Sequence, residues 1–304
     1  MSWARRAGYR LFGRRLDYLL HTRPTEWPIV AAHTAVGYLL AIGVRSATHG
    51  ERLGPAVLGL VLWVVCLNGG TLALNSAYDR DEGDIAYLRQ PPPPPGYLAG
   101  FGLSLMLAGL LGAFLLPRGY RLAYAVCLVL SVLYSVPPFR LKAVPGADWL
   151  INMVGFGTLT PYAGWAATGL PVGPVGRLVL LAFCPLFAAL YPLTQIYQFE
   201  EDARRGDRTL ARALGVRRSL VVASAGAALA FGLFGGAALQ AGWDSSESWR
   251  WLALGLAAIA WGLVLIPWLR YQQRMTVRQH QHGMYRALLA WALTDLAVIL
   301  AWGT

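Results

Sequence analysis

Apolar stretches of membrane-spanning length follow one another along this sequence, with only short polar segments between them. A helix needs about 20 mostly apolar residues to cross the hydrocarbon core of a bilayer. Nine stretches come close to that length, at about 27–46, 54–76, 97–116, 121–138, 149–168, 177–199, 219–241, 250–269 and 284–302. The pattern predicts an all-α polytopic membrane bundle of nine transmembrane helices, which forms a single domain over residues 1–304.

The composition also indicates a chain whose surface is not all in water. Only 13% of the 304 residues are charged, whereas a soluble domain has about 25%. The 12 Trp and 14 Tyr residues are typical of the aromatic belts at membrane interfaces. The three cysteines fall within apolar stretches and have no metal-ligand or disulfide spacing.

Basic residues predict how the bundle is oriented. Residues 1–24 contain six arginines but no apolar core of a signal peptide, which favours a cytoplasmic helix lying on the membrane surface. Of the 26 Lys and Arg residues, 20 fall on the side of the N-terminus and six on the other. The positive-inside rule then predicts a multi-pass protein of the cell (inner) membrane with a cytoplasmic N-terminus and an external C-terminus. The net charge of +11 is explained by the excess of basic residues on the cytoplasmic side and by attraction to anionic membrane lipid. It is not interpreted as a sign of nucleic-acid binding.

Eight of the 15 acidic residues fall in two short segments, 75–84 and 198–207, both on the predicted cytoplasmic side. In each segment an amide residue precedes an aspartate by four positions, as in Asn75 and Asp79, so each pair lies on one helical face. Carboxylate and amide oxygens suit Mg²⁺, which binds a few such ligands together with water and substrate phosphates. Arginines between the acids, among them Arg80 and Arg205, are candidates for binding phosphate oxygens. The alternative is a pair of solvated loops with self-paired charges.

Three segments resemble the UbiA superfamily of intramembrane prenyltransferases. NSAYDRDEGD resembles the first aspartate-rich motif, YQFEEDARRGDRTLARALG resembles the second, and residues 134–157 resemble the stretch between the fourth and fifth helices. The resemblance covers nearly the whole chain, in order. It implies a nine-helix bundle with an active site open to the cytoplasm. It also implies Mg²⁺-dependent transfer of a prenyl group from a polyprenyl diphosphate to a lipophilic acceptor, either aromatic or isoprenoid.

The resemblance implies catalytic roles for Asn75, Asp79 and Asp202. The metal ligands expected from the two motifs are Asn75, Asp79, Asp84, Gln198, Glu201 and Asp202. Two positions depart from the family pattern, because Gly83 and Gln198 stand where aspartates are expected. The departures leave the ligand set open, with Glu201 and Asp207 as available substitutes.

Candidate substrate-binding residues lie on the same predicted membrane face: Arg23, Arg80, Tyr134, Ser135, Arg140, Lys142, Asn152 and Arg205. Tyr134, Ser135, Arg140 and Lys142 match the family segment in which hydroxyl and basic groups hold the diphosphate. The alternatives are an interfacial belt role for Tyr134, membrane anchoring for Arg140 and Lys142, and a helix contact for Asn152. Asn152 and Asp148, four residues apart, are both expected to line the cavity.

Asp295 lies deep in the last apolar stretch, where an unpaired ionisable group costs at least ~2.5 kcal/mol. We therefore expect it to face the bundle, toward His33, as a structural pair in preference to an acceptor contact.

Three other functions fit parts of the pattern. A transporter of an anionic lipid-like substrate is disfavoured because transporter sites usually lie at the midplane of the membrane. A CDP-alcohol phosphotransferase is disfavoured because its Asp-Gly-x-x-Ala-Arg signature is absent from the sequence. A degenerate, non-catalytic family member stays open because of Gly83 and Gln198. The sequence does not specify the acceptor, the prenyl chain length or the oligomeric state.

Overall fold

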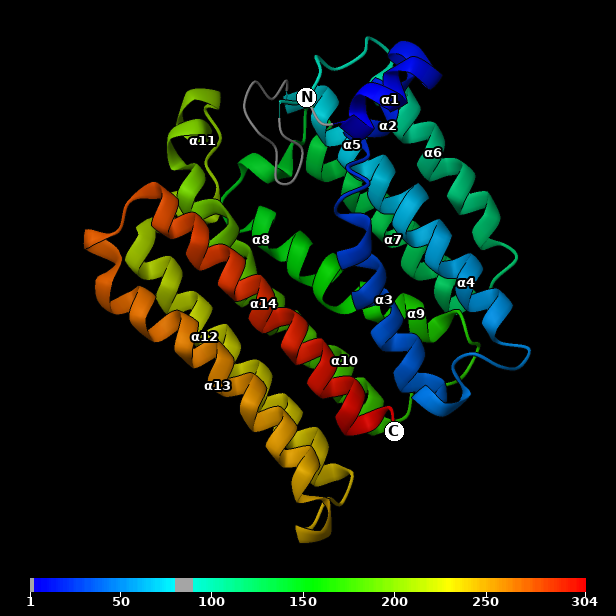
Figure 1. Cartoon of the computed structure of the whole chain (residues 1–304), viewed down its shortest axis with the longest axis vertical. Coiled ribbons are helices and arrows are strands. Elements are labelled where there is room, and N and C mark those ends of the chain that lie inside the picture. Colours follow the sequence, from blue (N-terminus) through cyan, green and yellow to red (C-terminus); the bar gives the residue numbers. More distant parts are fainter. Residues whose placement is uncertain (1–2, 80–89) are drawn as a thin grey trace.

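The computed structural model describes residues 3–79 and 90–304, and helices are the regular structure of these residues, without a strand. Long helices run side by side, and the N-terminus and C-terminus lie at opposite ends of the bundle (Figure 1). The candidate residues Arg80, Gly83 and Asp84 lie outside the described residues, and so does the side chain of Arg205.

The N-terminal part contains two surface helices followed by five longer helical segments. The elements are α1 (Trp3–Phe12), η1 (Gly13–Arg15), α2 (Leu16–His21), α3 (Trp27–Ile42), η2 (Val44–Ser46), α4 (Leu53–Val61), the π-helical η3 (Leu62–Asn68), α5 (Gly69–Asp79), α6 (Leu98–Ala113), α7 (Arg118–Ser135), η4 (Leu141–Ala143), α8 (Ala147–Asn152), the π-helical η5 (Met153–Leu159) and α9 (Thr160–Ala166). Helix α3 crosses α9 at Gly37 and Gly164, where a Cβ atom on either glycine would collide with a carbonyl oxygen of the other helix. Such close approach of small residues is how helices pack in membranes, because lipid supplies no hydrophobic drive between them.

The C-terminal part contains four long helices. Its elements are α10 (Pro174–Gln195), η6 (Ile196–Gln198), α11 (Phe199–Arg205), α12 (Leu210–Gln240), η7 (Ser245–Glu247), α13 (Ser248–Tyr271), η8 (Gln272–Arg274) and α14 (Val277–Trp302). Helix α10 packs against α12 and α14, and α13 packs against the same two helices. Phe183, Leu186 and Leu193 of α10 are fully buried in the core. The C-terminal end of α10 is held against α8, where Gln195 Nε2 donates to the Asp148 carboxylate.

Each of the nine predicted stretches falls on a helical segment. Five segments are long and apolar enough to cross a membrane: Leu53–Asp79, Pro174–Arg204, Leu210–Gln240, Ser248–Arg274 and Val277–Trp302. Helices α3 and α6 are apolar but shorter, and the stretch 149–168 is divided among α8, η5 and α9. The all-helical architecture of a multi-pass membrane protein is therefore observed, whereas the number of nine spans stays a prediction.

The predicted pairing of Asp295 with His33 is confirmed. His33 Nδ1 lies 3.1 Å from Asp295 Oδ1 and connects α3 to α14. The imidazole is fully buried and is surrounded by the rings of Phe156, Phe183 and Trp291. This pair satisfies a polar group that the bilayer core would otherwise penalise.

Candidate functional site

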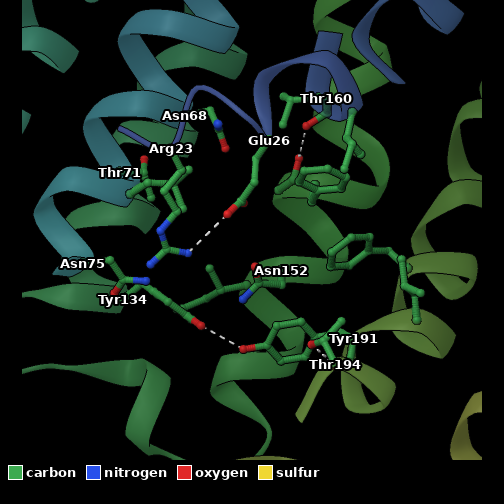
Figure 2. Close-up of a pocket in the computed structure, with 18 of the residues that line it drawn as sticks. Arg23, Glu26, Asn68, Thr71, Asn75, Tyr134, Asn152, Thr160, Tyr191 and Thr194 are labelled. Atoms are coloured by element: carbon green, nitrogen blue, oxygen red, sulfur yellow. Dashed lines mark hydrogen bonds and ion pairs between the residues drawn. The ribbon is translucent and has the colours of Figure 1, made fainter. Parts of the chain in front are cut away.

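A cavity of about 400 Å³ lies between the two parts of the bundle. Helices α5, α7, α8, α10 and α14 and both π-helical segments contribute to its wall. Single π-helical turns occur frequently at functional sites, since they re-aim side chains within a helix. The apolar wall includes Phe156, Phe187 and Trp291. Polar side chains enter the cavity from several helices, among them Asn68, Asn152 and Tyr191 (Figure 2).

The first acidic segment meets the loop after α7 at one end of this cavity. Asn75 Oδ1 accepts hydrogen bonds from Ser135 Oγ at 3.0 Å and from Lys142 Nζ at 3.1 Å. Lys142 Nζ is also paired with Asp79 Oδ1. Lys142 is buried, with 7% of its surface exposed, so it is not an interfacial anchor. The expected grouping of Asn75, Asp79, Ser135 and Lys142 is therefore present in the fold.

Arg140 connects the first acidic segment to the second. Its NH1 lies 3.1 Å from Asp207 Oδ1, and its NH2 lies 3.4 Å from Asp79 Oδ1. Arg140 has a φ of +39°, a left-handed conformation that costs a non-glycine residue about 1–3 kcal/mol and persists where the surroundings impose it. The two carboxylates hold the guanidinium between the motifs.

Asp202 and Asp207 adjoin each other at the end of α11. Gly206, with a φ of +74°, ends the helix, and the Asp207 amide donates to the Asp202 carbonyl at 2.9 Å. The Asp202 carboxylate accepts a hydrogen bond from Thr209 Oγ1 at 3.1 Å, while Asp207 faces Arg140. The structure thus brings Asp207 of the second segment to Asp79, and the role of Asp202 as a ligand stays a prediction.

Asp148 is the central polar residue behind the site. It is fully buried, and its carboxylate accepts hydrogen bonds from the Gly146 amide at 2.9 Å, Gln195 Nε2 at 2.8 Å and the Leu210 amide at 3.0 Å. The expectation that Asp148 lines the cavity is wrong, because these three donors hold its carboxylate in the protein interior, away from the cavity. Asn152 does line the cavity, and its amide also donates to the Asp148 carbonyl at 2.8 Å.

Tyr134 faces the cavity, not the lipid. Its hydroxyl lies 2.8 Å from the hydroxyl of Tyr191 (Figure 2). No sequence pattern singles out Tyr191, since an isolated tyrosine in an apolar helix has no local signature. Gln198 also lines the cavity and donates from Nε2 to the Tyr197 hydroxyl at 2.9 Å, so its carbonyl oxygen is the atom that could serve as a ligand.

The sequence matches the family model described as the UbiA prenyltransferase family over residues 30–289. The chain belongs to this family. It is 30% identical over 250 residues to a digeranylgeranylglyceryl phosphate synthase of Methanoregula boonei, with 78% of this chain and 80% of that protein covered. It is also 30% identical over 219 residues to a rice protein named as a probable homogentisate phytyltransferase, with 63% of this chain covered. The chain spans only 55% of the length of the rice protein.

Solved UbiA structures share the fold. A UbiA homolog from Archaeoglobus fulgidus, solved with GPP and Mg²⁺, superposes with a TM-score of 0.67 at 20% identity. The comparison covers 93% of this chain and 99% of that one. At this level of identity the likeness shows the fold alone, so the site of this UbiA member has to be judged on its own residues.

The donor atoms of the site suit a hard divalent cation. Asn75, Asp79 and Asp207 supply amide and carboxylate oxygens, the ligand type that Mg²⁺ prefers. In the structure these oxygens are paired with Lys142 and Arg140, so a metal ion that binds them would share or replace these contacts. Among residues 3–79 and 90–304, no three His, Cys, Asp or Glu side chains form a metal-binding group.

Proposed function

We propose that this UbiA-family protein transfers a prenyl group from a prenyl diphosphate to a lipophilic acceptor within the membrane. The observation that carries the proposal is the cluster of Asn75, Asp79, Asp207, Lys142 and Arg140, which joins both acidic segments and adjoins the cavity through Asn75. A largely apolar cavity beside a charged cluster matches a substrate with an apolar tail and an anionic head. The names of the relatives and the Archaeoglobus structure with GPP and Mg²⁺ support this substrate class.

The proposed metal site consists of Asn75, Asp79 and the second acidic segment, with Gln198, Glu201, Asp202 and Asp207 as its candidate ligands. When bound there, Mg²⁺ would neutralise charge on the diphosphate leaving group. Asp84 is a further proposed metal ligand, and Arg80 and Arg205 are proposed to bind phosphate oxygens. We further propose that this end of the bundle faces the cytoplasm, with the N-terminus inside.

Protein groups then act on the leaving group. As the bond between the allylic carbon and the diphosphate oxygen lengthens, negative charge grows on that oxygen. Lys142, Arg140 and Ser135 donate hydrogen bonds at this end, so they stabilise the transition state more than the bound substrate. The apolar wall excludes water that would otherwise capture the developing cation.

A transfer assay tests the proposal, with purified protein in liposomes, labelled geranyl diphosphate as donor and a panel of acceptors. We expect a prenylated lipid product that disappears with EDTA and returns with Mg²⁺, measured by chromatography of the extracted lipid. Full activity after chelation would contradict the metal requirement. Binding of geranyl diphosphate without product from any acceptor would identify a non-catalytic member.

A further inference from the structure

Glu26 presents a carboxylate to the cavity and belongs to neither of the two acidic motifs. It lies between α2 and α3 and lines the cavity together with Arg23 (Figure 2). Arg23 NH1 is 3.6 Å from Glu26 Oε1, and the two side chains are only 11% and 20% exposed. Among the described residues, Arg23 is the one ion-pair or hydrogen-bond partner of this carboxylate. A carboxylate accepts about four hydrogen bonds, so most of its capacity is available to a ligand.

The fold holds this segment in place. Trp27 Nε1 donates to the Thr22 carbonyl at 2.9 Å, and Thr22 Oγ1 donates to the Leu19 carbonyl at 2.7 Å. Arg23 takes a left-handed φ of +50°, which positions the guanidinium and the Glu26 carboxylate toward each other in the cavity. A surface ion pair needs no such positioning.

Asn68 is a second polar residue of the same cavity with hydrogen-bonding capacity to offer a ligand. Asn68, the last residue of the π-helical η3, lines the cavity, and its Nδ2 has no acceptor among the described residues. Buried polar groups of native proteins are nearly always hydrogen-bonded, so each exception calls for an explanation. A ligand hydroxyl, which both donates and accepts, fits a cavity that offers a carboxylate and an amide.

We propose that Glu26 binds the hydroxyl group of the prenyl acceptor and takes up the proton that this acceptor loses. The inference rests on the proposed function and names the acceptor class, a neutral molecule that carries an alcohol or phenol O–H. The bond from the allylic carbon to the diphosphate breaks, and its electron pair leaves with the diphosphate. The acceptor oxygen, or a ring carbon activated by it, bonds to the allylic carbon. The released proton passes to Glu26 and from there to water.

A carboxylate acceptor would not suit this arrangement. It carries no proton to release at neutral pH, and its negative charge would face the Glu26 carboxylate. Arg23 offsets only part of that repulsion, because its own guanidinium is already paired with Glu26. The expected order of acceptors is therefore hydroxyl before carboxylate.

The protonation of Glu26 gives this role a pH signature. Burial raises the pKa of the Glu26 carboxyl above its ordinary value, and the Arg23 guanidinium opposes the rise. A base works only when ionised, so turnover is lost as pH falls through this raised pKa. The other titratable groups that line the cavity are Arg23, Cys127, Tyr134, Tyr191, Tyr197 and Tyr285. Arginine, cysteine and tyrosine ionise above the acidic range. The carboxylates of the adjoining proposed metal site are the same in wild type and Glu26→Gln, so the difference between the acidic limbs of the two proteins reports on Glu26.

The test compares wild-type protein with Glu26→Gln in liposomes, with geranyl diphosphate as donor. A methyl-substituted hydroquinone, dodecanol and dodecanoate serve as acceptors. We expect the wild type to prenylate a hydroxyl acceptor and to leave dodecanoate unchanged. Glu26→Gln should lower kcat by about 10²–10⁴-fold, change the KM for geranyl diphosphate by less than two-fold and shift the acidic limb of the pH profile to lower pH. Glu26→Asp, which can still accept a proton, should recover part of the rate.

Glu247→Gln is the matched control. Glu247 pairs with Arg250 at the same i, i+3 spacing, with NH1 and Oε1 3.0 Å apart, but neither residue lines the cavity. This variant should keep the wild-type rate and pH profile. A Glu26→Gln protein that retains the wild-type rate, or a wild type that prefers dodecanoate, would overturn the role of Glu26 and leave the proposed function standing. A wild type that transfers no prenyl group to any acceptor would overturn both.

Discussion

Asp79 and Asp295 are two carboxylates with the same degree of burial and different surroundings. Their side chains are 10% and 11% exposed, respectively. Asp79 contacts Lys142 and Arg140 at the end of α5. Asp295 pairs with His33, whose ring is surrounded by aromatic rings, and no Lys or Arg among the described residues pairs with Asp295. Burial by itself therefore does not identify a functional acid. The two aspartates differ in their partners, because Asp79 contacts two cationic side chains and Asp295 contacts a histidine.

Among Asp79, Asp148 and Asp295, removal of Asp79 should give the largest effect on activity. Asp79→Ala takes away a proposed ligand and removes the contact between Asp79 and Lys142, so prenyl transfer should fall by about 10²–10³-fold or more. Membrane insertion should be unaffected, because no apolar segment changes. The measurements are product formation in liposomes and the amount of protein in the membrane fraction. Wild-type turnover in this variant would remove Asp79 from the site.

Asp148 sharpens the comparison, since its three hydrogen-bond donors are all neutral. In Asp148→Asn one acceptor oxygen becomes an amide nitrogen that faces N–H donors, which should cost about 1–3 kcal/mol of stability. Because these donors belong to the loop before α8, to α10 and to α12, the second acidic segment should shift and activity should fall with stability. Thermal unfolding and kcat should both decrease. A loss of kcat at unchanged stability would instead indicate direct contact with substrate.

Asp295 should give the smallest effect on catalysis. Asp295→Asn keeps an oxygen that can accept from His33 but loses the charge, so we expect a loss of about 1 kcal/mol in the free energy of unfolding. Turnover should stay within two-fold of wild type, while Tm falls by about 2–4 °C. The reverse ranking, with lower turnover at unchanged Tm, would make this pair part of the acceptor site.

Local patterns predicted much of the site. The i, i+4 spacing of Asn75 and Asp79 predicted a shared helical face, and both side chains contact Lys142. The resemblance to the family pointed to Ser135, Arg140 and Lys142, which the fold brings to the first motif. It did not point to Glu26, to Tyr191 or to the buried hydrogen bonds of Asp148. The partners and the cavity of these residues come from distant parts of the chain, so no short segment predicts them.

The sequence by itself determined the helices, their apolar character and the positions of the two acidic segments, because hydropathy and helical periodicity are properties of neighbouring residues. Only the tertiary structure decided which charges meet. Arg140 lies 61 residues from Asp79 and 67 from Asp207, and His33 lies 262 residues from Asp295. Such pairs form only when helices pack, since packing alone makes it favourable to bury one charged group against another.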